Sequence, residues 1–202
     1  GVGKTIAALS MAMNFIQYFQ REDAMGSSTP GSVFVIGFTE SIFKTELLRF
    51  PEFGFISRQE LARLNMLKKL AYAGSKFDIE KLQEFMIKIK KRFGNRKNMG
   101  FFKFIGYKKL VNMIFIITDP NLSLNTLDED GILKAIKDDR IKPNIDLLNQ
   151  FKNSIIICDE IHNVYNSLDK NNWGVAIQYI LNYHPSIRAV FMSATPLNNN
   201  PT

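Results

Sequence analysis

The chain has 202 residues, 46% of them hydrophobic and 22% charged, and its net charge is +7. These values exclude an intrinsically disordered segment and predict one good-sized globular domain. The sequence lacks an apolar run that could span a membrane and the pattern of a secretory signal, so we expect no membrane partner. A single cysteine excludes an internal disulfide and argues against a zinc site, which is typical of a reducing, intracellular compartment.

The basic residues are concentrated in one internal segment. Residues 58–110 contain 15 Lys or Arg and 4 Asp or Glu, a local charge of +11, and the rest of the chain sums to −4. Such a concentration favours contact with a polyanion, although a hydrated basic face would have the same composition.

The first 50 residues alternate between a helical and a strand pattern. Apolar residues spaced three and four apart predict an amphipathic helix over residues 5–20. The continuous apolar run of residues 32–38 predicts a strand that is buried on both faces of a parallel sheet. A turn and a short helix should follow and end at Pro51.

Residues 52–100 predict a basic helical insertion within the domain. The sequence SRQE at residues 57–60 is a capping box that begins a helix ending near Gly74. A second helix should begin near Asp78, with one apolar face and one basic face. The apolar face consists of Ile79, Leu82, Met86, Ile89 and Phe93, and the basic face of Lys81, Lys88, Lys91 and Arg92. We expect Lys88, Lys91 and Arg92 to contact nucleic acid; a protein-binding or simply hydrated face is the alternative.

The second half of the chain repeats the alternation. Strands are expected at residues 101–107, 153–160 and 187–196, and helices at 108–115, 145–151 and 173–182, with a further helix capped by residues 126–129. The run at residues 113–118 fits either a helix end or a strand. Fully apolar strands alternating with helices predict a three-layer α/β domain, whose ligands should bind at the carboxyl ends of parallel strands.

The first chemical motif is Gly-Lys-Thr at residues 3–5. The phosphate-binding loop G-x-x-x-x-G-K-[ST] ends in these residues, and Gly1 and Val2 belong to the same loop. Gly3 lets the backbone approach phosphate oxygens, Lys4 would reach the β- and γ-phosphates, and the Thr5 hydroxyl would bind Mg²⁺. By itself the tripeptide is equally compatible with an ordinary helix start.

The second motif is the carboxylate pair that follows the strand ending at Cys158. Asp159 suits a contact with Mg²⁺, and Glu160 suits orienting or deprotonating an attacking water molecule. The alternative is a hydrated acidic turn. A third motif, Ser193-Ala194-Thr195, follows the last apolar strand.

These three motifs, in this order, resemble motifs I, II and III of superfamily 2 helicases and translocases. The resemblance covers the chain from end to end. It implies a RecA-like P-loop NTPase fold that binds ATP and Mg²⁺, in which Lys4, Asp159 and Glu160 are catalytic. It also implies that His162 couples the nucleotide site to Ser193, Ala194 and Thr195. A hydrogen-bonded structural histidine is the alternative for His162.

Two further segments match family motifs that touch the nucleic-acid backbone. Residues 38–47 lie where the family has motif Ia, which implicates Thr39 and Ser41. Residues 105–111 resemble motif Ib, which implicates Gly106 and Tyr107. Ile161, where the family has a small residue, and the long segment 52–100 depart from the family pattern.

The sequences DEIHNVYN and SATPLNNNPT also resemble the small subunit of poxvirus-type early transcription factors of large cytoplasmic DNA viruses. This resemblance implies a DNA-dependent ATPase of viral transcription initiation, with duplex DNA, a second transcription-factor subunit and a viral RNA polymerase as partners. It implies a location in the virion and the host cytoplasm. It further implies that the chain is the first lobe of a larger protein, lacking both ends of that lobe and the second lobe with its arginine fingers.

Three other functions remain open at this stage. TPLNNN is similar to a segment of Snf2-like translocases and of the viral nucleoside triphosphatase that acts in transcription termination. A P-loop kinase or GTPase would share Gly-Lys-Thr, but it would have no need of the second and third motifs together. A lobe that binds without catalysing would have no need of Lys4, Thr5, Asp159 and Glu160 together.

Overall fold

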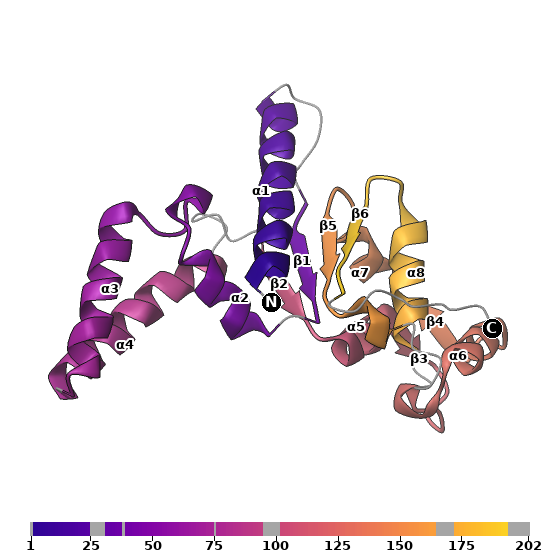
Figure 1. The fold of residues 1–202 in the computed structure, drawn as a ribbon. Coiled ribbons are helices and arrows are strands. Elements are labelled where there is room, and N and C mark those ends of the chain that lie inside the picture. The colour runs from indigo at the N-terminus through magenta and orange to yellow at the C-terminus, as the bar shows by residue number, and fades with distance from the viewer. Residues whose placement is uncertain are drawn as a thin grey trace, which may run out of the picture.

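The computed structural model describes residues 2–24, 31–37, 39–74, 76–94, 102–164 and 172–193. Its centre is a parallel four-stranded sheet in the order β2-β1-β5-β6 (Figure 1). The strands are β1 (Val33–Ile36), β2 (Phe102–Ile105), β5 (Ile155–Cys158) and β6 (Arg188–Phe191). The predicted α/β class with a parallel sheet is therefore confirmed, and the strands are shorter at both ends than the apolar runs suggested.

Helices cover both faces of this sheet, which gives the three layers expected from the sequence. On one face lie α1 (Val2–Ala24) and α2 (Glu40–Leu47). Their side chains share a core with Val33, Val35, Ile155 and Ile157. On the other face lie α5 (Tyr107–Ile114), α6 (Glu129–Lys137), α7 (Ile145–Asn149) and α8 (Trp173–Tyr183).

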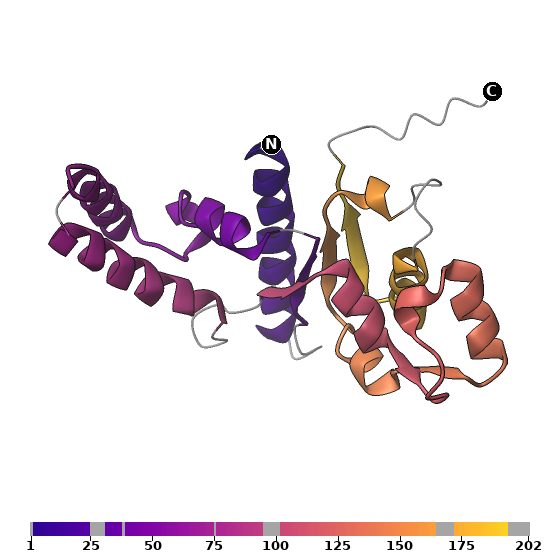
Figure 2. The ribbon, with the colours of Figure 1, turned by 90° about the horizontal axis from the view of Figure 1, so that it is seen from below.

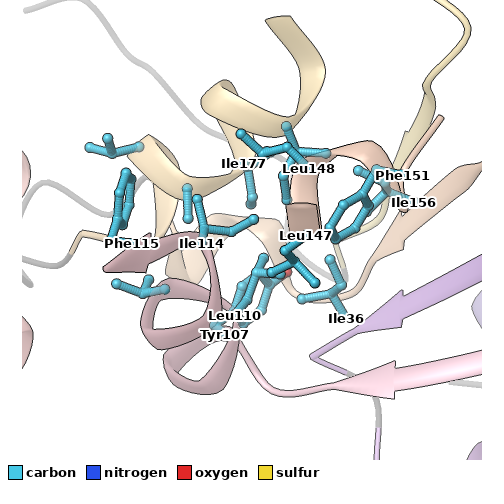
Figure 3. Close-up of a cluster of buried hydrophobic side chains, with 14 of the residues drawn as sticks. Ile36, Tyr107, Leu110, Ile114, Phe115, Leu147, Leu148, Phe151, Ile156 and Ile177 are labelled. Atoms are coloured by element: carbon cyan, nitrogen blue, oxygen red, sulfur yellow. The ribbon is translucent and has the colours of Figure 1, made fainter. Parts of the chain in front are cut away.

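The alternation of side chains along β1 and β5 explains why both faces are apolar. Phe34, Ile36, Ile156 and Cys158 point away from α1 and join the core formed by the later helices (Figure 3). Every residue of these two strands is buried. Two central strands that contribute to two cores must be apolar throughout, which is the pattern read from the sequence.

The last strand corrects one expectation. We expected β6 to be buried like β1 and β5, but Arg188, Ala189 and Phe191 are exposed and Val190 is half-buried. The reason is position: β6 pairs with β5 and ends the sheet order, so it has a neighbouring strand on one side. An apolar composition is shared by central and edge strands, so composition could not separate them.

Two local ambiguities are resolved by the structure. The helix α5 ends at Ile114 and the chain continues directly into β3 (Phe115–Ile117), which pairs antiparallel with β4 (Ile141–Pro143). Both interpretations of residues 113–118 were thus partly right. The cap of α6 is Asp128, whose carboxylate accepts a hydrogen bond of 3.0 Å from the backbone amide of Gly131.

The helices predicted within residues 52–100 are present as a packed pair. Between α2 and β2 the chain forms a 3-10 turn (Pro51–Phe53), α3 (Arg58–Tyr72), α4 (Lys76–Lys90) and a second 3-10 turn (Lys91–Gly94). Ser57 and Glu60 form the capping box expected at the start of α3. In both views the α3–α4 pair, here called the hairpin, extends away from the sheet (Figures 1 and 2). None of the helices in the described ranges is long and apolar enough to cross a membrane.

Candidate nucleotide-binding site

The first and second motifs meet at the carboxyl edge of the sheet. Lys4 lies in the first turn of α1, and Asp159 and Glu160 follow the last residue of β5. The Lys4 ammonium group donates a hydrogen bond of 3.0 Å to Asp159 Oδ1 and also contacts the Glu160 carboxylate. The expected convergence of these residues, far apart in sequence, is therefore observed.

The backbone at this edge is held by hydrogen bonds that continue the sheet. The Asp159 amide donates to the carbonyl oxygen of Ile36 at 2.9 Å, and the Ile161 amide donates to Met192 at 3.0 Å. Between them Glu160 has a φ of 50° and a ψ of 44°. A left-handed conformation is uncommon for a residue with a side chain, and such strain is concentrated at functional sites.

The charges at this edge favour a protonated lysine. Partial burial lowers the pKa of Lys4, but its hydrogen bonds to Glu160 and Asp159 outweigh that effect, so the pKa is raised above its ordinary value. The side chain of Lys4 is 19% exposed and that of Asp159 is 14% exposed. The two carboxylates therefore already hold a cation in a partly desolvated place.

The phosphate-loop residues lie at the start of α1 rather than in front of it. The helix begins at Val2, three residues earlier than predicted, so that Gly3 and Lys4 are helical. The first backbone amides of a helix have no acceptor within it and point toward its N-terminus, where anions bind. Thr5 is 7% exposed. Gly1 and the side chain of Val2 lie outside the described residues.

The third motif is linked to the second through His162. Its Nδ1 atom lies 2.8 Å from the Ser193 hydroxyl and 3.2 Å from Glu160 Oε2. Ser193 comes two residues after the end of β6, so the histidine joins the ends of two adjacent strands. This is the contact that the resemblance implied for His162. Ala194 and Thr195 lie outside the described residues.

The residues predicted to contact nucleic acid separate into two groups. Thr39, Ser41 and Gly106 are exposed near the same edge of the sheet. Tyr107 is not available for such a contact, because it is 8% exposed and its hydroxyl donates to the Asp159 carbonyl oxygen at 2.6 Å. Its position at the start of α5 turns it inward over the end of β1, and the sequence motif gave no sign of that direction.

The predicted basic face is also only partly correct. Lys81, Lys88 and Lys91 are exposed, as expected. Arg92 instead forms a two-pronged ion pair with Glu60, one arm measuring 2.9 Å, and donates to the Phe55 carbonyl oxygen at 3.3 Å. The turn after α4 rotates Arg92 toward α3, so this residue fastens the base of the hairpin.

Two residues of the site were missed by sequence reasoning. Gly37 follows β1 with a φ of +80°, and Trp173 stacks on the Tyr107 ring at 5.1 Å. A glycine at the end of a buried strand was the available signal for the first. Trp173 begins α8, far from Tyr107 in sequence, so only the fold reveals this contact.

Comparison with known proteins finds relatives in African swine fever virus. The chain is 36% identical over 228 aligned residues to the early transcription factor large subunit homologues of isolate Tick/Malawi/Lil 20-1/1983 and of the Badajoz 1971 Vero-adapted strain. The alignment covers 99% of this chain and 20% of each relative, so the chain spans about a fifth of their length. The relatives are named for the large subunit, which corrects the expected resemblance to a small subunit. No protein-family model and no solved structure matches the chain.

Proposed function

We propose that this chain is the first, RecA-like lobe of a superfamily 2 motor ATPase that acts on DNA during viral early transcription. The observation that carries the proposal is the meeting of Lys4 with Asp159 and Glu160 at the carboxyl edge of a parallel sheet. The link from His162 to Ser193 adds the third motif to the same place. The relatives named as early transcription factor subunits support the viral setting.

The residues present fit a Mg²⁺-nucleotide. The Asp159 carboxylate and the Thr5 hydroxyl are the hard oxygen donors that Mg²⁺ prefers, and the first amides of α1 suit phosphate oxygens. The cation already seated on Asp159 and Glu160 is Lys4, which shows that this edge accommodates positive charge. When bound, Mg²⁺ would neutralise charge on the phosphates and help align them.

The chain's own residues would then act by exchange of partners. Lys4 would leave the carboxylates and bind the β- and γ-phosphates, because phosphate oxygens offer a lysine the same charge-assisted hydrogen bonds. Release of Lys4 would free Glu160 to orient and deprotonate the attacking water. His162 contacts both Glu160 and Ser193, so a movement of Glu160 on nucleotide binding would be transmitted to the end of β6.

The DNA would contact the chain near the same edge and along the hairpin. Thr39 and Gly106 are exposed directly before α2 and α5, and Ser41 is exposed in the first turn of α2. On α4, helical spacing places Lys81 and Lys88 on one exposed ridge that Lys91 extends. Exposed lysines along one ridge suit the phosphate backbone, which is recognised through charge.

The proposal extends to partners and location. A second transcription-factor subunit and a viral RNA polymerase would be partners in the cytoplasm of the infected host cell, and duplex DNA would be the track. The proposed second lobe would supply an arginine finger, which contributes about 10³–10⁵ in rate. The 202-residue chain by itself should therefore hydrolyse ATP slowly.

The decisive experiment measures ATP hydrolysis by the complete protein that contains this chain, with and without duplex DNA. The expected result is Mg²⁺-dependent hydrolysis that DNA accelerates. The Asp159→Asn variant should lose hydrolysis, and Asp146→Asn, an exposed residue of α7, serves as its matched control. Hydrolysis that is absent from the wild type, or unaffected by Asp159→Asn, would overturn the proposal.

A further inference from the structure

The Tyr107 side chain bridges two strands that are not neighbours in the sheet. Tyr107 begins α5, directly after β2, and its hydroxyl donates to the main-chain oxygen of Asp159, directly after β5. In the sheet order β2-β1-β5, strand β1 lies between them. The phenol ring therefore passes over the carboxyl end of β1 to reach the residue that carries the site carboxylate.

Gly37 makes this crossing possible. It follows β1 with a φ of +80°, and a Cβ atom at this position would lie 2.5 Å from Tyr107 Cε2 and 2.9 Å from the Asp159 carbonyl oxygen. Its amide also donates to the Ile105 carbonyl oxygen at 3.2 Å. A side chain here would both strain the backbone and displace the ring.

The ring is fixed on its other side as well. Trp173 stacks on it with centroids 5.1 Å apart and an angle of 10° between the planes. Burial, with the nearby Cys158 and Asp159, raises the pKa of the Tyr107 phenol far above its ordinary value. The hydroxyl consequently stays protonated and remains a hydrogen-bond donor throughout the physiological range.

The acceptor makes this bond more than a core contact. The Asp159 carbonyl belongs to the peptide that leads into Glu160, whose left-handed backbone aims its carboxylate at Lys4 and His162. At the other end, Tyr107 follows Gly106, which is exposed, and it touches the loop that leads to Thr39. The Tyr107 side chain thus connects the segments that follow β1 and β2 with the carboxylates of Asp159 and Glu160.

We propose that Tyr107 is a positioning residue that transmits DNA contact at the loops after β1 and β2 to Asp159 and Glu160. This inference rests on the proposed ATPase function. A phosphate backbone pressing on Gly106 or Thr39 would shift the start of α5, and the hydroxyl would carry that shift to the Asp159–Glu160 peptide. DNA stimulation of hydrolysis would depend on this bond, and hydrolysis without DNA would depend on it much less.

The test compares Tyr107→Phe with Tyr183→Phe in the complete protein. Both changes remove one hydroxyl donor and keep the ring; the Tyr183 hydroxyl donates to Asn149 at 2.7 Å, on the opposite side of the domain from the carboxyl edge. Tyr107→Phe should keep hydrolysis without DNA within about twofold and reduce the stimulation by duplex DNA about five- to tenfold, the effect of one hydrogen bond. Tyr183→Phe should keep both rates.

A second variant disturbs the same contact from the side of β1, and thermal midpoints separate its effect from a general loss of folding. Gly37→Ala adds the Cβ that meets the ring, so it should reduce DNA stimulation in the same direction, and the thermal midpoint of each variant shows whether it is folded. Full stimulation in Tyr107→Phe would overturn the inference and leave the ATPase proposal standing. An equal fall of both rates would make Tyr107 structural and also overturn it. A wild type without DNA-stimulated hydrolysis would overturn the ATPase proposal and the inference together.

Discussion

The edge of the sheet and the base of the hairpin each contain an ion pair between distant segments, yet the two pairs differ in kind. At the hairpin, the Arg92 guanidinium grips both oxygens of Glu60 in a planar fork. At the sheet, the Lys4 ammonium sits between two separate carboxylates. A guanidinium fork is rigid and specific in its geometry, and an ammonium group is a point charge that can change partners. We infer that the first pair holds structure and the second is made for exchange.

The sheet edge and the hairpin also differ in how their charged side chains are arranged. At the sheet edge, opposite charges lie together and half-buried, so that a small movement alters each one's surroundings. Along α4, lysines of like charge are spread over an exposed ridge. The first arrangement suits chemistry on a bound ligand, and the second suits a diffuse attraction to a polyanion. Substitutions in the two regions test this difference.

The largest effect is expected from Glu160→Gln. If Glu160 is the base that activates water, as we propose, this change should slow hydrolysis by the complete protein about 10²–10⁴-fold, because general bases contribute that much. Nucleotide affinity should stay close to that of the wild type, as measured by fluorescence titration with a labelled nucleotide. Glu129→Gln, an exposed carboxylate at the start of α6, is the matched control. Normal turnover by Glu160→Gln would contradict the role of this carboxylate.

Lys4→Ala should weaken nucleotide binding itself. The charge-assisted hydrogen bonds that this change removes correspond to about 1.5–3 kcal/mol, or about 10–100-fold in affinity. Lys134→Ala removes an exposed lysine of α6 and should bind normally. If Lys4→Ala bound nucleotide as tightly as the wild type, Lys4 would be a structural partner of the carboxylates. The proposed difference between the Lys4 ion pairs and the Arg92–Glu60 pair would then be wrong.

The lysine ridge should show itself in the salt dependence of DNA binding. Each lysine that neutralises a DNA phosphate steepens the slope of log affinity against log salt by about 0.9, because binding releases a counterion. The combined change of Lys81, Lys88 and Lys91 to Gln should therefore flatten the slope by about 0.9 for every one of these lysines that binds a phosphate. The control changes Lys134, Lys137 and Lys142, three exposed lysines elsewhere, by the same charge. Equal slopes in both triple variants would assign the ridge to another partner or to water.

The smallest effect is expected from Arg92→Ala, and it should fall on stability. Both partners of this pair are 28% exposed, so we expect the free energy of unfolding to drop by about 1–2 kcal/mol in urea titrations. Arg49→Ala breaks the Arg49–Glu46 surface pair, in which the arginine is 57% exposed, and should cost about 0.5 kcal/mol or less. Nucleotide binding should be unchanged in both variants.

The pH dependence of Arg92→Ala sharpens this last prediction. The hydrogen bonds from Arg92, with a smaller contribution from the Ser57 capping box, lower the pKa of Glu60 from 4.5 to about 2. A folded-state pKa below the unfolded value stabilises the protein fully above pH 4.5 and loses that contribution as the pH falls toward 2. The stability difference between wild type and Arg92→Ala should therefore shrink across this window. A difference that stays constant would show that the ion pair is not its source.

Several local elements and the motif residues could be predicted from the sequence itself. Continuous apolar runs define β1 and β5, and the capping box at Ser57 and Glu60 defines the start of α3, because these signals depend on neighbours along the chain. The convergence of Lys4 with Asp159 also followed, since parallel strands present their carboxyl ends at one edge. A pattern of neighbouring residues is enough to predict a feature that depends only on local geometry or on a general rule of parallel sheets.

Only the tertiary structure decided which way the ambiguous side chains turn. Tyr107 and Arg92 carry groups that suit nucleic acid. The Tyr107 ring instead lies over Gly37 and its hydroxyl donates to the Asp159 carbonyl oxygen, and Arg92 forms an ion pair with Glu60. The exposure of β6 was settled likewise by its place at the end of the sheet order. In each case the partner comes from a segment distant in sequence. Its contact depends on the packing of whole elements, which a pattern of neighbouring residues does not contain.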